Sequence, residues 1–379
     1  MGSELVGLLS ADKGNEVVAV SRHANATTRQ NLRYMRGDAF EPSFIGKLLR
    51  GNFDVVVDFM WHDEESISRL LPLFLRSAGQ YFFLSSAAVY ADSDTPLKED
   101  SPRFIDLASS SERHSAEYHI AKARAEDVVV RANSGNWTVI RPHVVYNGSR
   151  LPLCTWEKGV WLPLSIRGIP IATPEDVLQK KTTLTHGREI ARQICTLAGK
   201  KDALGEVFNV GSEDVHTWGE LFDIYDALIH EATGHRIAKH KSSADEISRH
   251  IPTMKSRFSN DRLLDRRFDL SKYKAVSRAD TGDGRPLRES ISECVRLALA
   301  SKKAQTAKIA DFDALAGNGR ITGIKPSPSL FTGRDKASSI LRSIGIPDRI
   351  TTCVVEPEKA FCLAISMARR MLKKARCPP

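Results

Sequence analysis

Cysteine is scarce in this chain, and no two cysteines form a C-x-x-C pair. Zinc sites and disulfide scaffolds need cysteines at short, regular spacings, so the pattern argues against both. It is typical of a protein from a reducing cytoplasm. The sequence therefore predicts no metal site and a cytoplasmic location. The six cysteines are at positions 154, 195, 294, 353, 362 and 377.

Long apolar runs and targeting signals are missing too. No stretch approaches the roughly 18 uninterrupted apolar residues that a membrane-spanning helix requires. Acidic Glu4 interrupts any signal-peptide pattern, and Val6 stands where a myristoylation site needs Ser or Thr. With 41% hydrophobic and 27% charged residues among 379, the composition is that of a globular protein with ample core.

The positive charge is concentrated at one end of the sequence. The last 79 residues contain 15 Lys and Arg against 6 Asp and Glu, which accounts for the whole formal net charge of +9. Residues 357–376 predict a terminal helix with one apolar and one basic face. Such a helix docks on the body of the protein, or contacts nucleic acid, an anionic membrane surface or another subunit, as in a homodimer.

Residues 16–150 alternate between strand and helix patterns. Runs such as VVVDFM and YFFL are almost continuously apolar, as expected for strands that are covered on both faces. The sequence predicts an α/β fold with a doubly wound parallel sheet. The expected strands are 16–20, 32–38, 54–60, 80–86 and 137–142.

The alternation weakens after residue 147. We expect a dinucleotide-binding domain over 1–146, to which 181–215 return, and a smaller substrate-binding region over 147–180 and 216–300. Within that region Thr217 and Gly234 predict the two ends of one amphipathic helix. Residues 301–379 form a basic extension.

One constellation of residues has the chemistry of proton transfer. Ser86 ends an apolar strand, and Tyr118 and Lys122 follow about thirty residues later. Four residues apart on a helix, the tyrosine and the lysine share one face. An ammonium beside the phenol stabilises the phenolate, which prepares tyrosine for acid–base work. Taken alone, the Y-x-x-x-K pattern also fits an ordinary solvated contact.

The context of these residues resembles the extended short-chain dehydrogenase/reductases, the NAD-dependent epimerase/dehydratase family, over roughly residues 1–300. YFFLSSAAVYA is similar to the family strand that ends at the catalytic hydroxyl, and YHIAK matches its Tyr and Lys. VIRPHVVYNG, TTLTHGREIARQI and GEVFNVGSEDVHTWGELF resemble the segments that follow in order.

The resemblance implies an NAD(P)-dependent nucleotide-sugar epimerase or ketoreductase. Tyr118 would be the acid–base group, Lys122 its electrostatic partner and ribose ligand, and Ser86 the donor to the reacting oxygen. Family dehydratases carry Asp-Glu directly after this hydroxyl, where this chain has Ala87 and Ala88. A 4,6-dehydratase is therefore disfavoured.

The cofactor pattern is only half present. The family has a strand and a G-x-x-G-x-x-G turn before its first helix, and MGSELVGLL resembles that helix with Gly2 as the third glycine. The resemblance implies a strand and two glycines ahead of Met1. Ser21 and Arg22 stand where NAD-binding members have an acidic residue, which favours NADP over NAD, although Arg22 also fits a solvated loop.

Further site residues follow from the resemblance alone. Asp38 matches the residue beside the adenine, or is a plain turn residue, and Pro142 follows as a cofactor contact. Tyr146 and His186 would face the substrate, with a structural role as the alternative for the histidine. Trp61 and His62 replace small residues beside the nicotinamide, where they shape the pocket or pack.

A second hypothesis is not enzymatic. DVVVDFMWHDEES and THGREIARQI resemble an atypical branch of the family that includes plastid RNA-associated members, some without the catalytic tyrosine. On this hypothesis the chain is a catalytically impaired protein that binds RNA or acts as a scaffold through its basic tail. Because Tyr118 and Lys122 are retained, an enzyme is favoured.

Overall fold

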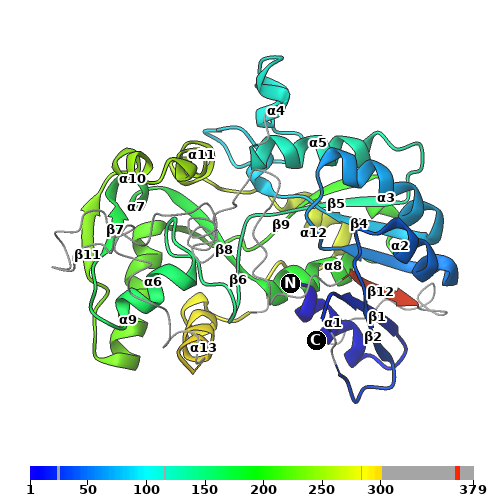
Figure 1. Ribbon diagram of the computed structural model, residues 1–379, viewed down its shortest axis with the longest axis horizontal. Coiled ribbons are helices and arrows are strands. Elements are labelled where there is room, and N and C mark those ends of the chain that lie inside the picture. Colours follow the sequence, from blue (N-terminus) through cyan, green and yellow to red (C-terminus); the bar gives the residue numbers. More distant parts are fainter. Residues whose placement is uncertain (24–25, 115–116, 283, 301–362, 368–379) are drawn as a thin grey trace, which may run out of the picture.

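The computed structural model describes residues 1–23, 26–114, 117–282, 284–300 and 363–367. It contains a seven-stranded sheet with helices on both faces and, beside it, a second lobe with two small sheets (Figure 1). This confirms the predicted fold class. None of the helices among these residues is long and apolar enough to cross a membrane.

The large sheet has the order β2-β1-β12-β3-β4-β5-β9. All neighbours pair in parallel except β12, which is antiparallel to both β1 and β3. The five strands predicted from residues 16–142 are present with shifts of up to two residues at their ends. The bounds are β1 Glu16–Ser21, β2 Leu32–Arg36, β3 Phe53–Asp58, β4 Ala78–Leu84, β5 Trp137–Pro142, β9 Glu206–Val210 and β12 Leu363–Met367.

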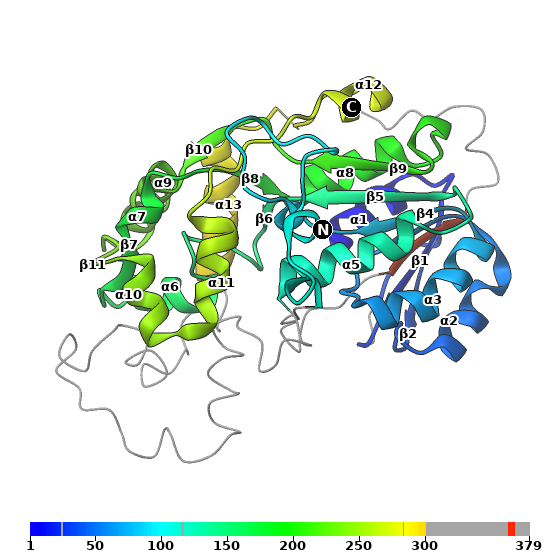
Figure 2. The same cartoon turned by 90° about the horizontal axis from the view of Figure 1, so that it is seen from above.

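Successive residues of the strands pack on opposite faces of the sheet, as the period of two requires. Val18 and Val56 point to one face with α2, α3 and α5, while Val17 and Val57 point to the other with α1, α8 and α12. Figure 2 shows the two helical layers on either side of the strands. The bounds are α1 Gly2–Ala11, α2 Pro42–Leu48, α3 Glu64–Ser77, α5 Tyr118–Val130, α8 Gly187–Leu197 and α12 Ser271–Ser277.

The second lobe has its own apolar core around Trp161, Trp218 and Tyr225. Helix α9 (Trp218–Thr233) has the predicted ends, since Thr217 Oγ1 accepts from Glu220 N and Gly234 has a φ of +76°. The other elements are β6 Val144–Tyr146, β7 Ile171–Pro174, β8 Lys181–His186, β10 Val215–Thr217, β11 Lys239–Ser242, α6 Lys158–Ser165, α7 Glu175–Leu178, α10 Ala244–His250, α11 Lys255–Arg257 and α13 Leu287–Ala300.

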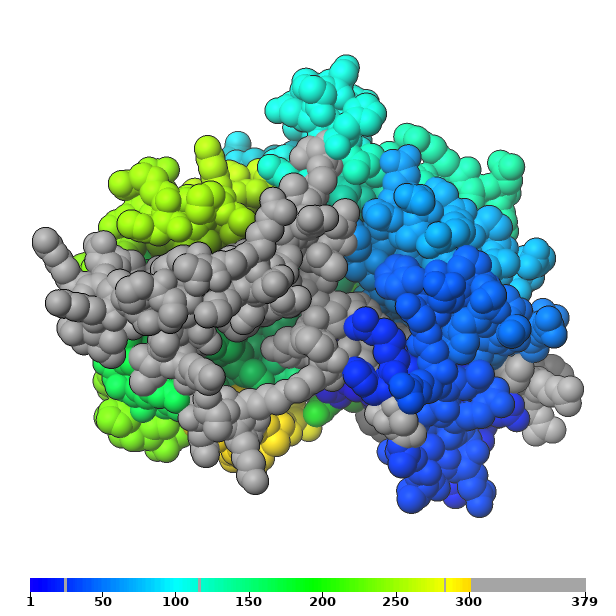
Figure 3. All heavy atoms as spheres, viewed as in Figure 1, coloured from blue at the N-terminus to red at the C-terminus, as the bar shows by residue number. Residues whose placement is uncertain are grey.

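Helix α4 (Phe104–Leu107) lies outside both cores. It projects from the surface above α5 (Figure 3), and the Leu107 side chain is 69% exposed. Residues 187–210 return to the large sheet through α8 and β9, whereas β8 pairs with β6 and β10 in the smaller lobe.

Part of the segment predicted as a terminal helix is the strand β12. Leu363–Met367 pair with Glu16–Val20 on one side and Val55–Asp58 on the other, so the helix expected over 357–376 is wrong for these five residues. The remainder of that helix, and the basic residues of the tail, lie outside the described residues. A short apolar run fits either secondary structure, and here two unpaired strand edges decide the outcome.

The position of β12 is the one that a strand leading directly into α1 occupies in a doubly wound sheet. Without β12, the facing edges of β1 and β3 would carry unpaired backbone N–H and C=O groups inside the sheet. Such groups are costly when buried, so the slot must be filled for the sheet to be stable.

A proline in β12 tests this pairing. Ile365→Pro removes one ladder N–H in the middle of a central strand, which should lower stability by about 1–3 kcal/mol, while Ile365→Val keeps that N–H and should lower stability by less. Thermal and urea unfolding measure the difference. If the proline variant unfolds together with the valine variant and the wild type, β12 does not stabilise the sheet.

Candidate active site

Helix α5 carries Tyr118 and Lys122 on one face. Tyr118 is the first residue of the helix and is 42% exposed, whereas Lys122 is 4% exposed. Lys122 Nζ donates to the backbone oxygen of Leu84 at 2.9 Å and lies 5.3 Å from the centre of the Phe83 ring. A buried ammonium is thus anchored to the carboxyl end of β4, one helical turn from an accessible phenol.

Ser86 follows the same end of β4. Its Oγ accepts from Ala88 N at 3.2 Å and caps the short 3-10 turn η2 (Ala87–Val89). A hydroxyl that accepts through its oxygen can still donate its proton to another group. The structure therefore brings the end of β4, with Ser86, against the face of α5 that carries Lys122.

A buried ion pair holds the other end of this face. Glu126 is 1% exposed and Arg141 on β5 is 4% exposed. Arg141 Nε donates to Glu126 Oε2 at 3.1 Å, and Nη2 donates to Oε1. Arg141 Nη1 also donates to the Tyr90 hydroxyl at 2.7 Å, and that hydroxyl donates to Asn209 Oδ1 at 2.7 Å. The network joins α5, β5, β9 and the segment after Ser86.

Burial alone would raise the pKa of the Glu126 carboxyl, but the Arg141 guanidinium lowers it below its usual range. For the phenol, burial outweighs the same guanidinium, and the pKa of Tyr90 is raised. A carboxyl with a lowered folded-state pKa stabilises the protein above its unfolded-state pKa and loses this effect as pH falls through the folded-state value. The ion pair is therefore fully formed at neutral pH.

The residues predicted to bind a cofactor lie around the carboxyl edge of the sheet or at the start of α1. Gly2 opens α1, Ser21 ends β1 with 1% exposure, and Arg22 follows it on the surface. Pro142 is buried at the end of β5. Asp38 is exposed, and its Oδ1 accepts from Phe40 N at 3.0 Å, as in an acidic turn residue.

The loop after β3 combines a buried cluster with a donor that lacks an acceptor. Asp58 Oδ2 accepts from the Tyr81 hydroxyl at 2.9 Å and lies 2.7 Å from His62 Nε2, and all three side chains are fully buried. His62 is therefore a packing residue within this buried cluster. Burial and the Asp58 carboxylate raise the pKa of Tyr81 well above its usual range. Trp61 Nε1 is buried without an acceptor in the described part of the chain.

Tyr146 and His186 lie together in the smaller lobe. Their rings are 5.1 Å apart, edge to face, and both residues are less than 9% exposed. His186 caps α8, because its Nδ1 accepts from Arg188 N at 3.1 Å and its own N–H donates to Glu189 Oε1 at 3.3 Å. These contacts match the structural alternative for the histidine.

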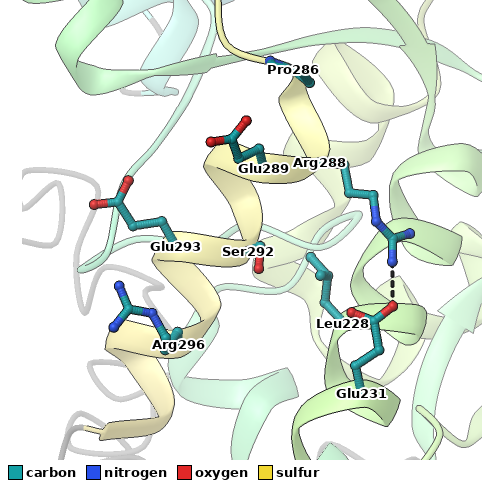
Figure 4. A pocket seen from close by; sticks show the side chains of 8 residues that line it. All are labelled: Leu228, Glu231, Pro286, Arg288, Glu289, Ser292, Glu293 and Arg296. Atoms are coloured by element: carbon teal, nitrogen blue, oxygen red, sulfur yellow. Dashed lines mark hydrogen bonds and ion pairs between the residues drawn. The ribbon is translucent and has the colours of Figure 1, made fainter.

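A groove in the smaller lobe is separate from these residues. Figure 4 shows it between α9 and α13, with charged side chains along its walls and an ion pair between Glu231 and Arg288. It lies away from α5 in both ribbon views.

Among the described residues there is no cluster of three or more His, Cys, Asp or Glu that could hold a metal, and this includes the residues that line the groove. The lining residues are Leu228, Glu231, Pro286, Arg288, Glu289, Ser292, Glu293 and Arg296.

Sequence reasoning missed the residues that support the site from beneath. Glu126 is eight residues after Tyr118, so the helical spacing alone predicts that it lies on the same face. The partners Arg141 and Asn209 are far away in the sequence, and only the pairing of β4, β5 and β9 brings them to the helix.

Solved structures share this fold. MoeE5 in complex with UDP-glucose and NAD is 21% identical with a TM-score of 0.57, and the match covers 79% of this chain and 96% of MoeE5. A UDP-glucuronic acid 4-epimerase from Bacillus cereus, in complex with UDP-glucuronic acid and NAD, is 15% identical with a TM-score of 0.58, covering 79% and 96% of the two chains.

The epimerase Mth375 from Methanothermobacter thermautotrophicus is 14% identical with a TM-score of 0.55, and the match covers 74% of this chain and 83% of Mth375. No protein-family model and no curated protein sequence matches this chain. Identities of this size establish a common fold, and function has to be argued from the site.

Removing one partner of the buried ion pair tests its role. Arg141→Met leaves the Glu126 carboxylate buried with weaker compensation, so the free energy of unfolding at pH 7 should fall by about 3 kcal/mol or more. The double variant Glu126→Gln/Arg141→Met should recover a large part of this loss. Urea unfolding measures both, and a single variant as stable as the wild type would contradict the proposed anchoring.

Proposed function

We propose that this protein is an NAD(P)-dependent enzyme that acts on a nucleotide sugar, as an epimerase or a ketoreductase. The observation that carries the proposal is the hydrogen bond from the Lys122 ammonium to Leu84 O at the end of β4. Leu84 is two residues before Ser86, and Lys122 is one helical turn after the accessible Tyr118. The shared fold supports it, because the matched MoeE5 and Bacillus cereus structures contain NAD and a UDP-sugar.

The residues around the sheet edge fit a dinucleotide in part. Trp61 Nε1 is a buried donor that lacks an acceptor among the described residues, and ribose or phosphate oxygens are acceptors of the right kind. The first amides of α1, from Gly2 onward, can face a pyrophosphate. The slot beside α1 departs from the usual arrangement, since an antiparallel β12 occupies it.

The proposed mechanism assigns one role to each side chain. Lys122 stabilises negative charge at the Tyr118 oxygen and contacts a ribose hydroxyl, and Tyr118 takes up or returns the proton of the reacting sugar hydroxyl. Ser86 donates a hydrogen bond to the same sugar oxygen. A nicotinamide, when bound, supplies hydride transfer. No carboxylic acid follows Ser86, so the proposal does not include loss of water from the sugar.

The remaining residues define the two ends of the ligand site in this proposal. Ser21, Arg22 and Asp38 would contact the adenosine half of the dinucleotide, and Pro142 would be a further contact to the cofactor. Tyr146 would face the sugar from the smaller lobe, and His186, which caps α8, would support the Tyr146 ring from beside it. The bound NAD in the matched structures and the arginine at the end of β1 favour different dinucleotides, which makes Arg22 the residue to test.

The non-enzymatic alternative depends on the basic tail, most of which lies outside the described residues. No contact among the described residues favours nucleic acid. A titration with single-stranded RNA separates the two hypotheses, because RNA binding that disappears on deleting residues 368–379 is expected only from a protein that acts through its tail.

Substitution of the phenol tests the proposed chemistry. Tyr118→Phe should reduce turnover of UDP-sugars by about 100-fold or more, because it removes the proton-transfer group, and the fold should be unchanged since the side chain is exposed. Product analysis by chromatography together with circular dichroism measures both effects. A variant with full activity would show that Tyr118 is not the acid–base group.

Arg22 tests the choice of dinucleotide. Arg22→Ala should weaken NADP⁺ binding about fivefold or more relative to NAD⁺, because an exposed arginine contributes a charge-assisted hydrogen bond to the 2′-phosphate. Calorimetric titration with both dinucleotides gives the ratio of Kd values. An unchanged ratio would show that Arg22 does not contact the 2′-phosphate. Lys13→Ala, which removes another exposed positive charge from the same lobe, is the matched control.

A further inference from the structure

One short segment of the smaller lobe contacts α5, the turn that Ser86 caps and the end of β5. It consists of α11 and the π-helical turn η6 (Phe258–Arg262) and extends to Arg266, and we call it the 255–266 segment. π-helical turns are uncommon and are frequent at functional sites. In Figures 1 and 2, α11 lies on the side of the smaller lobe that faces α5.

The first contact is with the residue that precedes Tyr118. Glu117 is the N-cap of α5, and its Oε2 accepts from Ser256 Oγ at 2.9 Å and from Asn260 Nδ2 at 3.1 Å. Two donors on one carboxylate oxygen connect the start of the helix to the 255–266 segment. Tyr118, the next residue, is thereby held relative to the smaller lobe.

The second contact is with the residue that follows Tyr118. His119 is 7% exposed, its ring lies edge to face on Phe104 at 4.7 Å, and Asn260 Nδ2 approaches Nδ1 at 3.3 Å. Burial lowers the pKa of His119 and Arg266 adds to this effect, while the Glu117 carboxylate opposes it, so the balance favours the neutral ring. Asn260 therefore touches the neighbours of Tyr118 on both sides.

The third contact is with the end of η2, the turn that Ser86 caps, and we call Ser86–Tyr90 the Ser86 turn. Arg266 is 1% exposed, its Nη2 donates to Tyr90 O at 3.0 Å and to Asn260 O at 2.7 Å, and its Nη1 donates to Ala91 O at 3.0 Å. One guanidinium thus ties the end of the Ser86 turn to the backbone of Asn260.

The fourth contact reaches the end of β5. Asp261 Oδ1 lies 3.2 Å from His143 Nε2, one residue after Pro142. Burial would raise the pKa of the Asp261 carboxyl, but the neighbouring Arg262 and His143 lower it well below its usual range. The carboxylate is ionised and can hold both groups.

We propose that Asn260 is a positioning residue, which acts through Glu117 and His119 to set the distance between Tyr118 and Ser86. This inference rests on the proposed function and deepens it, because it assigns the alignment of the proton-transfer groups to the smaller lobe. Displacements of about 1 Å at reacting groups cost up to about 100-fold in rate, so loss of this contact should reduce kcat more than it changes KM.

Exchanging the carboxylate at position 117 with the amide at position 260 provides the test. Asn260→Asp removes the donor and places a second carboxylate against Glu117, whereas in Glu117→Gln the amide oxygen can still accept from Asn260 Nδ2. The double variant Glu117→Gln/Asn260→Asp restores one donor and one acceptor with the roles exchanged. Lys255→Ala, an exposed change in the same segment, is the matched control.

Two readouts are measured on the full chain. The first is kcat and KM for the UDP-sugar reaction, and the second is hydrogen exchange of the amides from Ala121 to Ala125, which needs no activity. We expect Asn260→Asp to lower kcat at least about tenfold and to speed exchange, and the double variant to recover both. The control should match the wild type.

The outcomes separate the two proposals. If the wild type has no turnover but exchange follows the expected order, the proposed function is wrong and the positioning contact stands. If the wild type is active and Asn260→Asp changes neither kcat nor exchange, or the double variant is no better than Asn260→Asp alone, the inference about Asn260 is wrong.

Discussion

The arrangement of this protein depends on two buried charges on one face of α5. Lys122 is anchored to the end of β4 and Glu126 to Arg141 on β5, so one helix fixes the ends of two parallel strands. Burying charges in this way is costly unless every partner is present. The cost is offset because Tyr90, Asn209 and Arg141 complete the hydrogen bonds at the same sheet edge, and the result is a rigid support one turn from an exposed phenol.

The smaller lobe completes that support. Its own apolar core is separate from the cores of the large sheet, yet the 255–266 segment sends polar side chains to α5, to the Ser86 turn and to the end of β5. Tyr118, the proposed proton-transfer group, is at the start of a helix, where the first amides lack partners within the helix. Contacts from a second lobe therefore have a larger effect at Tyr118 than they would in the middle of α5.

The sequence predicts most of the parallel sheet, because the strands near residues 16–20, 54–60 and 137–142 are apolar runs with clear boundaries. It also predicts that Tyr118 and Lys122 share a face and that Thr217 begins a helix, since these depend on local spacing. It fails at Leu363–Met367, where a helical pattern becomes a strand because the edges of β1 and β3 supply partners. Glu117 and Asn260 are 143 residues apart, so no local pattern links them.

The anchored Lys122 is proposed to belong to a dinucleotide site, and a binding measurement tests this most directly. Calorimetric titration with NAD⁺ and NADP⁺ should show saturable one-to-one binding of at least one of them by the wild-type chain. Lys122→Met should bind about tenfold more weakly or worse while keeping the secondary structure, because it removes the buried donor. The absence of binding by the wild type, or equal binding by both proteins, would contradict the account.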